Sequence, residues 1–119
     1  MPSTTTYECG QVVVVNVPFS DQTGSKRRPA LVLSVEAFHG RLPDVIACPI
    51  SSQPRYSEKP GPGDHPLRHW KEVGLRYRSA ARISNLLSVD KRIIERTLGY
   101  LAQEDLAGLR KRLRLAFGL

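Results

Sequence analysis

The chain has 119 residues, of which 40% are hydrophobic, so it is long enough for about one domain with a single core. Its 18 basic and 11 acidic residues give a formal net charge of +7, which favours a polyanionic partner such as RNA, DNA or an acidic protein segment; a solvated basic surface is the alternative. Cys9 and Cys48 provide neither a disulfide framework nor zinc-site spacing, and no apolar run approaches the roughly 20 residues that span a bilayer.

The first part of the chain predicts a tail, a strand and a loop. We expect residues 1–7 to form a flexible tail, and because they lack the charged-then-apolar pattern of a secretory signal, we expect a cytoplasmic protein. The β-branched residues 11–17 favour a strand that Pro18 closes. Residues 19–28 show no apolar periodicity and predict a long loop.

That loop ends in a basic run, Lys26, Arg27 and Arg28, and Pro29 then leads into an apolar strand over residues 30–34. Pro29 fixes its own φ and restricts Arg28 to an extended backbone. The guanidinium of Arg28 is therefore presented from a defined point, where it can act on a phosphate.

The middle of the chain predicts short strands separated by irregular segments. Residues 45–50 form the third strand, with Pro49 near its end, and residues 51–66 are rich in Ser, Pro, Gly and charge, which is typical of a second long loop. Residues 80–87 predict another strand, residues 90–94 a helical turn and residues 96–101 a last short strand.

Residues 104–117 predict the one clear helix, with an apolar stripe of Leu106, Leu109, Leu113 and Phe117 facing the core or a partner. Its basic residues lie in the last two turns, where they complement the helix dipole, and we favour this explanation over nucleic-acid contact. About five or six strands and a terminal helix predict a single domain over residues 1–119, mainly β, with a bent sheet or small barrel.

Several short motifs in this order resemble the MazF/PemK family of toxins, over nearly the whole chain. They are residues 10–17 (GQVVVVNV), 26–34 (KRRPALVLS), 48–52 (CPISS), 74–75 (GL) followed by 81–83 (ARI), and 98–101 (LGYL). The resemblance implies an SH3-like small β-barrel of the CcdB/MazF/PemK type and, in most members, a homodimer.

The resemblance also implies an activity. Members of the family are endoribonucleases of toxin-antitoxin systems that cut single-stranded RNA, such as mRNA, at short sequences without a metal or other cofactor. The ribose 2′-hydroxyl attacks the adjacent phosphate and leaves a 2′,3′-cyclic phosphate and a 5′-hydroxyl. A cognate antitoxin neutralises the toxin, and the complex binds DNA.

Carried over to this sequence, the resemblance assigns catalytic roles to Arg28 and Ser51. Arg28 matches the arginine before proline and would stabilise the phosphorane; a salt bridge anchoring the loop is the alternative reading. Ser51 stands where the family often has threonine and keeps the hydroxyl that can donate to a phosphate oxygen. Ser52 is a substitute for that role, and strand-end capping is the alternative for both serines. Lys26 and Arg27 would position the RNA backbone or remain solvated.

Arg82 is the third predicted catalytic residue: it matches an arginine that some members of the family use, and it would bind phosphate, with a structural ion pair as the alternative. Some members carry an aspartate two residues later, but here that position is Ser84, so the aspartate-based proton scheme does not carry over. Likewise, Ser25 stands where some members have a loop histidine.

The second loop supplies the remaining candidates for RNA binding. Gln53, Arg55 and Tyr56 combine an amide, a charge and a stacking ring, which suits unstacked bases, although a plain polar loop would look the same. His65 is the one histidine of that loop and would titrate near neutrality; an ordinary surface histidine is the alternative.

Two other functions remain open at this stage. One is a basic SH3-like module that binds RNA or protein without cutting, which Ser51 and Ser84 make plausible. The other is a toxin of related fold that acts on a protein target such as gyrase. The intact pair of Arg28 and Pro29 favours the nuclease, because neither alternative requires that arginine.

Overall fold

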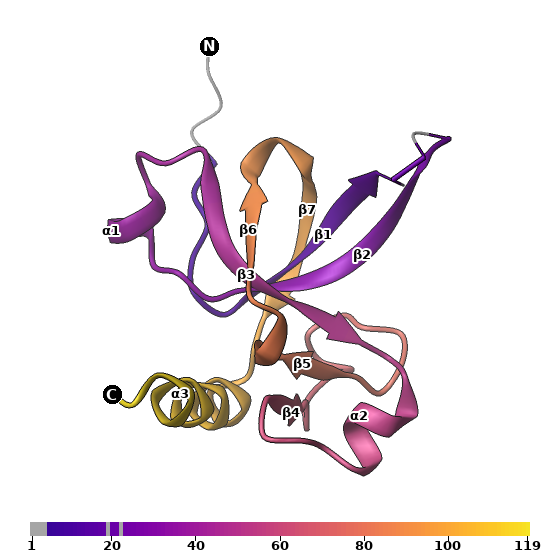
Figure 1. The fold of residues 1–119 in the computed structure, drawn as a ribbon, viewed down its shortest axis with the longest axis vertical. Helices are drawn as coiled ribbons and strands as arrows, with labels where there is room; N and C mark the ends of the chain where they lie inside the picture. The colour runs from indigo at the N-terminus through magenta and orange to yellow at the C-terminus, as the bar shows by residue number, and fades with distance from the viewer. Residues whose placement is uncertain (1–4, 19, 22) are drawn as a thin grey trace.

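The computed structural model describes residues 5–18, 20–21 and 23–119. Within them, seven strands form one antiparallel sheet in the order β4-β5-β3-β2-β1-β7, with β6 paired to β3, and α3 packs beside the sheet (Figure 1). The strands are β1 (Gln11–Pro18), β2 (Ser25–Val32), β3 (Asp44–Ser51), β4 (Asp64–Pro66), β5 (Ala80–Arg82), β6 (Leu87–Asp90) and β7 (Ile94–Tyr100). The helices are α1 (Glu36–His39), α2 (Pro54–Glu58) and α3 (Gln103–Phe117).

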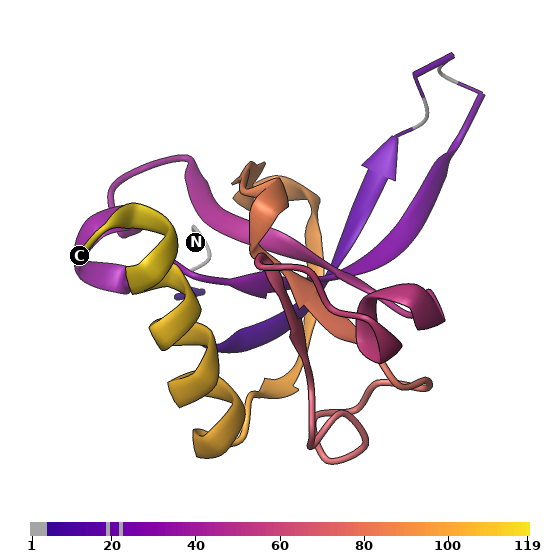
Figure 2. The ribbon, with the colours of Figure 1, turned by 60° about the horizontal axis from the view of Figure 1, so that its bottom comes forward.

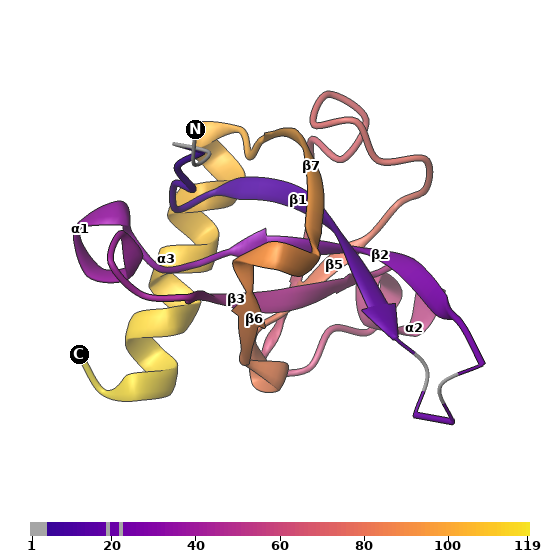
Figure 3. The same cartoon turned by 90° about the horizontal axis from the view of Figure 1, so that it is seen from above.

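Strand β3 bends the sheet because it pairs with three neighbours. Its first residues, 44–47, pair with β6, its last two pair with β5, and residues 47–49 pair with β2. The seven strands therefore curl around β3 (Figures 1 and 3). No pairing between described residues joins β7 to β6 or β4, so the sheet stays open. The predicted fold, mainly β with a C-terminal helix in a small barrel-like form, is confirmed.

Two apolar clusters lie on opposite faces of this sheet, and β1 contributes to both. Val12 packs with Leu31 and Cys48 in one cluster, whereas Val13 and Val15 belong to the other. Successive side chains of a strand point to opposite faces. A strand that is buried on both faces needs apolar residues at every position, which explains the uninterrupted valine run.

Helix α3 covers the first of these faces. Leu109 is fully buried in the cluster of Val12, and Leu106 and Leu113 pack against it, while Leu115 and Phe117 are exposed. Gly118, with φ of 69°, ends the helix in the left-handed region. The predicted helix is confirmed. No described helix is long and apolar enough to cross a membrane.

The N-terminal predictions need two corrections. Tyr7 is buried in the second cluster, so a flexible tail reaching residue 7 is wrong at that end, while residues 1–4 of the expected tail lie outside the described residues. The predicted loop over residues 19–28 is too long, because β2 begins at Ser25; Phe19 and Gln22 lie outside the described residues.

The basic run is consequently part of a strand. Arg28 pairs with Val15, Arg27 with Asn16 and Lys26 with Val17. The outer ends of β1 and β2 project from the body of the molecule (Figure 2). The composition of this polar segment does not predict a strand. It is extended because its backbone pairs with the valine strand β1.

The middle of the chain departs from the prediction in two further places. The predicted second loop contains the short helix α2 and the three-residue strand β4. The strand predicted over residues 80–87 is interrupted by a 3₁₀ turn, Ile83–Asn85, which separates β5 from β6. The turn predicted at residues 90–94 is present as Lys91–Ile93, and the last strand as β7.

The burial of α3 gives a first prediction. Leu109 is fully buried and Leu115 is 74% exposed on the same helix. We expect Leu109→Ala to lower the free energy of unfolding by about 2–5 kcal/mol, through lost burial and a cavity. Leu115→Ala removes the same atoms from an exposed position and should stay within about 0.5 kcal/mol of the parent protein. Urea denaturation at one protein concentration measures both, and equal losses would contradict the packing of α3.

Candidate functional site

The strand register places the three predicted catalytic residues on one face of the sheet. Ala30 of β2 pairs with Pro49 of β3, and Arg28 and Ser51 each lie two residues further along their strands in the same direction. Residues two apart in a strand share a face, as do directly paired residues. Ser51 pairs with Ala80 of β5, and Arg82 lies two residues beyond Ala80, so Arg82 shares this face as well.

A groove of about 1070 Å³ runs along this part of the molecule. Eight of the ten predicted site residues line it, namely Lys26, Arg27, Arg28, Ser51, Ser52, Gln53, Tyr56 and Arg82. Arg55 and His65 are not among its lining residues. The structure therefore brings the two predicted groups, the basic run and the start of the second loop, to one surface.

The charge of the groove is entirely positive. Among its described lining residues are six cations and no carboxylate; the cations are Lys26, Arg27, Arg28, Arg76, Arg82 and Arg96. Clustered cations in a concave surface raise the local positive potential and attract polyanions. Sequence analysis missed Arg76 and Arg96, as well as the exposed ring of Tyr77, because they come from segments without a recognisable motif.

The basic run divides into a paired and an unpaired part. The Nε of Arg27 lies 2.6 Å from a carboxylate oxygen of Glu95 on β7. The side chain of Arg28 makes no hydrogen bond or ion pair with another described residue, so the anchoring salt bridge weighed as its alternative role is not observed among these residues. The side chain of Arg28 is therefore available to a ligand, and so is that of Lys26.

Ser51 combines a structural contact with a free donor. Its hydroxyl oxygen accepts a hydrogen bond from the backbone N–H of Gln53 at 3.2 Å, which shapes the entry into α2. This is the capping role considered for the serine. The contact uses only an acceptor lone pair, and the hydroxyl proton can still be donated to a phosphate oxygen.

The ring of Tyr56 is already in contact with arginines. The guanidinium carbon of Arg82 lies 3.9 Å from the ring centroid and that of Arg55 lies 4.7 Å from it, both at cation–π distance. Arg55 also donates from Nη2 to the hydroxyl of Tyr56 at 2.7 Å. Tyr56 thus supports Arg82, in addition to the base-stacking role predicted for it.

Asp64 is the functional candidate that sequence analysis missed. Its Oδ1 accepts a hydrogen bond from Nε of Arg82 at 3.2 Å, across the register of β4 and β5. Arg82 thus forms the ion pair considered for it, with a carboxylate that follows Gly63, the residue packed against Ser84. A Cβ added to Gly63 would lie 2.8 Å from Cβ of Ser84. The glycine-rich turn before Asp64 was the available signal, because only glycine permits this approach.

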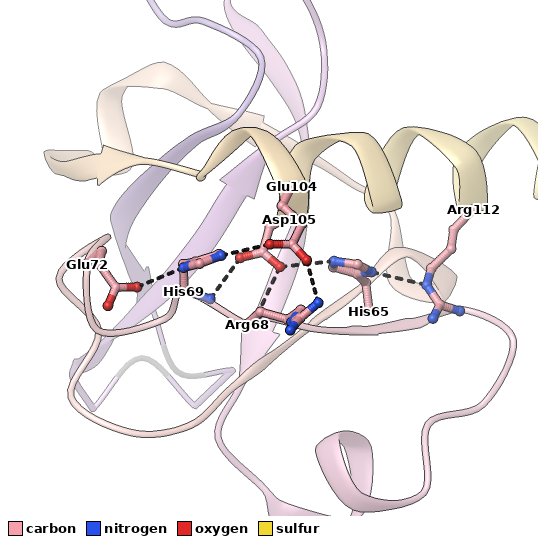
Figure 4. A network of polar contacts seen from close by, with 7 residues as sticks. All are labelled: His65, Arg68, His69, Glu72, Glu104, Asp105 and Arg112. Atoms are coloured by element: carbon pink, nitrogen blue, oxygen red, sulfur yellow. Dashed lines mark hydrogen bonds and ion pairs between the residues drawn. The ribbon is translucent and has the colours of Figure 1, made fainter.

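His65 does not line the groove, and its ring points toward α3 (Figure 4). The Nε–H of Arg112 donates to its Nδ1 at 3.2 Å, and its Nε2 lies 3.4 Å from Oδ1 of Asp105. Because Nδ1 accepts a hydrogen bond, the ring is neutral with its proton on Nε2. A Cβ on Gly108 would lie 2.5 Å from the ring, so His65 packs directly on the helix backbone. The RNA contact predicted for His65 has no support in this geometry.

The contacts of His65 belong to a network that joins α3 to the loop after β4. Asp105 is buried and accepts from the backbone N–H groups of Arg68 and His69 at 2.9 and 3.0 Å. Glu104 pairs with the side chains of Arg68 and His69 (Figure 4). The acidic first turn of α3 therefore holds the loop that follows β4.

Burial lowers the pKa of His65 below its usual range, against the opposing effect of Asp105. The half-buried His69 shifts the other way, because its hydrogen bond to Glu104 raises its pKa.

The comparisons with known proteins agree with this fold. The sequence profile of a family described as PemK-like, MazF-like toxin of type II toxin-antitoxin system matches residues 8–117. The chain therefore belongs to this family of toxins, and the resemblance drawn from its motifs is confirmed. No curated protein matches the chain in sequence.

Solved structures with this fold include toxins from two bacterial groups. A MazE–MazF structure from Deinococcus radiodurans has 28% sequence identity and a TM-score of 0.75, covering 97% of this chain and 99% of that chain. An endoribonuclease in complex with its cognate antitoxin from Mycobacterial species has 17% identity and a TM-score of 0.72, covering 95% and 96%. The toxin MazF-mt6 from Mycobacterium tuberculosis has 22% identity and a TM-score of 0.66, covering 90% and 97%. At these identities the two mycobacterial structures share the fold alone.

The opposite pKa shifts of His65 and His69 give a second prediction. A histidine whose folded-state pKa is lowered contributes stability that is present above its unfolded value of about 6.5 and is lost as the pH falls. We expect the free energy of unfolding to fall between about pH 7 and pH 5, and His65→Gln to flatten that fall.

His69→Gln is the matched control with the opposite sign. The raised pKa of His69 contributes stability at low pH that is lost as the pH rises, so its removal should steepen the acid loss. Urea denaturation across this pH range measures both effects. An unchanged pH dependence in His65→Gln would contradict the assignment of a neutral, buried ring.

Proposed function

We propose that this toxin is an endoribonuclease that cuts single-stranded RNA, such as mRNA, in the groove lined by Arg28, Ser51 and Arg82. The observation that supports this function best is the set of six cations without a carboxylate among the described lining residues. Such a surface attracts the anionic phosphodiester backbone of an extended single strand.

The proposed reaction is attack of the ribose 2′-hydroxyl on the adjacent phosphate. A 2′-oxygen–phosphorus bond forms, the bond to the 5′-oxygen breaks, and protons leave the 2′-oxygen and reach the 5′-oxygen. Arg28 stabilises the charge that develops on the phosphorane, and Ser51 donates to a non-bridging oxygen. Because the described lining residues include neither carboxylate nor imidazole, the groove acts mainly through charge stabilisation.

Substrate reading and partners complete the proposal. Lys26 and Arg27 position the RNA backbone, Gln53 and Ser52 contact bases at the start of α2, and Tyr77 offers a further exposed ring in the same groove. We propose a cytoplasmic single-domain toxin, neutralised by a cognate antitoxin with which it binds DNA. The MazE–MazF structure of Deinococcus radiodurans supports such a partner.

A homodimer is the assembly we propose, with the outer end of α3 in its interface. A second groove of about 360 Å³ is lined by Leu33, Ile46, Leu86, Leu113, Phe117 and Leu119, with Ser34, Arg110 and Arg114 at its sides. Phe117 is 58% exposed there although it continues the apolar stripe of the helix. Exposed apolar surface of this kind is commonly covered by another chain.

The nuclease function predicts cleavage that depends on Arg28. We expect purified protein in EDTA to cut a panel of single-stranded RNAs at specific sites and to leave 5′-hydroxyl ends, detected by direct labelling with polynucleotide kinase. Arg28→Ala should lower the rate by about 10²–10³-fold, as for loss of a principal charge-stabilising donor.

Arg92→Ala is the matched control, because Arg92 is an exposed arginine paired with Asp90 and does not line the groove. Ser51→Ala should also slow cleavage, whereas Ser51→Thr keeps the hydroxyl and should preserve it. Intact RNA across the panel, with binding retained, would instead establish the non-cutting module.

The proposed dimer predicts that a substitution in its interface abolishes dimerisation without unfolding the protein. Phe117→Asp places a charge in the exposed apolar groove and should shift the sedimenting species from dimer to monomer while the protein remains folded. Tyr77→Asp, at a similarly exposed aromatic residue outside that groove, is the control and should leave the dimer intact. A monomeric parent protein, or a dimeric Phe117→Asp, would contradict this interface.

A further inference from the structure

We propose that Asp64 is a positioning residue that holds Arg82 so that the Nη edge of its guanidinium is presented to an RNA phosphate. The inference rests on the proposed function of the groove and adds a residue from outside its lining. Some family members have an aspartate where this chain has Ser84, and Asp64 is a carboxylate that contacts Arg82 from another strand.

The first support is the backbone. Asp64 and Arg82 are direct partners in the antiparallel pair of β4 and β5, so their side chains leave the sheet on the same face. A second link, from the N–H of Ile83 to the carbonyl of Gly63 at 2.8 Å, fixes the same two segments just beyond the pair. The distance between carboxylate and guanidinium is therefore set by strand pairing.

The second support is the way in which the carboxylate is held. Oδ1 of Asp64 accepts from Nε of Arg82 at 3.2 Å, and Oδ2 accepts from the backbone N–H of Gly61 at 2.9 Å. The Asp64 side chain is only 10% exposed. With each oxygen bonded and little access to solvent, Asp64 is suited to orient its partner and not to take a proton from RNA.

The third support is what remains free on Arg82. Only Nε bonds to Asp64, and the Nη1–Nη2 edge carries the parallel N–H donors that match two phosphate oxygens. In the orientation of the Asn85 amide that satisfies its neighbours, its oxygen accepts from Nη1 at 3.3 Å. No hydrogen bond between described residues involves Nη2.

The ring of Tyr56 restricts Arg82 further, because it lies 3.9 Å from the guanidinium carbon. Asp64 fixes the guanidinium at one edge and Tyr56 covers its plane, so the side chain is ordered before RNA binds. A donor that is already ordered loses less conformational freedom on binding and stabilises the transition state more effectively.

A double-mutant cycle tests the inference. We expect Asp64→Asn to lower kcat for RNA cleavage by about 10- to 100-fold with little change in KM, because a misplaced catalytic group costs chemistry more than binding. In the Arg82→Ala background the same substitution should have almost no further effect, because Asp64 acts through Arg82.

Asp90→Asn provides the matched control, since Asp90 also pairs with an arginine, Arg92, but neither residue lines the groove. It should leave kcat unchanged. Equal losses from Asp64→Asn in both backgrounds would show that Asp64 acts through the Gly61 turn, and this result would overturn the inference. So would an Arg82→Ala variant with parent activity.

A measurement on the unmutated protein covers the case in which Asp64→Asn fails to fold. Nitrogen-15 NMR of the Arg82 side chain follows binding of a 2′-deoxy oligonucleotide, which cannot be cleaved. We expect the Nη resonances to shift and the Nε–H resonance to stay in place. The reverse pattern would contradict the inference.

The two proposals can fail separately. If the parent protein binds RNA without cutting it, the nuclease function fails, and the same cycle is measured on affinity for the 2′-deoxy oligonucleotide. Non-additive losses of affinity would then still support Asp64 as the residue that positions Arg82. If the protein cuts RNA and the cycle is additive, the nuclease function holds and the role of Asp64 is wrong.

Discussion

β3 pairs with β2 along one edge and, along the other, first with β6 and then with β5. A strand shared in this way must bend between its two sets of partners, and the bend gives the sheet its barrel-like form. The same pairing fixes the surface of the proposed site, because the register from β2 through β3 to β5 sets Arg28, Ser51 and Arg82 on one face. The arrangement of these residues is therefore a consequence of strand register and does not require a specialised loop.

The charges near the groove and those beside α3 are arranged differently. Near the groove, the available carboxylates stand beside individual arginines, as Glu95 does for Arg27 and Asp64 for Arg82, and the described lining residues include no acid. On the side of α3, the acidic residues Glu104 and Asp105 join the helix to its neighbouring loop. Unbalanced cations repel each other in the folded protein, and an anionic backbone relieves this repulsion. The proposed binding of RNA in the groove should accordingly weaken as the salt concentration rises.

The elements with strong periodic or compositional signals could be predicted from the sequence. The valine run of β1 predicts a strand and the apolar stripe of α3 predicts a helix. The family motifs led to Arg28, Ser51 and Arg82. β4 could not be predicted, because a strand of three residues has no periodicity and is stabilised by its pairing with β5. Asp64 was missed for the same reason, since its partner Arg82 lies 18 positions away and only the register joins them. His65 was misplaced because a loop was expected where the chain forms a strand packed on a helix.

Asp64 and His65 are neighbours on β4 and therefore point to opposite faces of the strand. Asp64 contacts Arg82 on one side, whereas His65 contacts Asp105 and Arg112 on the other. β4 is paired with β5, and these two side-chain contacts hold its opposite faces as well. Loosening His65 from α3 would consequently move Asp64 and, through it, Arg82. If a substitution at His65 lowers RNA cleavage, the cause would thus be a displacement of β4. The buried ring of His65 need not contact RNA for this loss to occur.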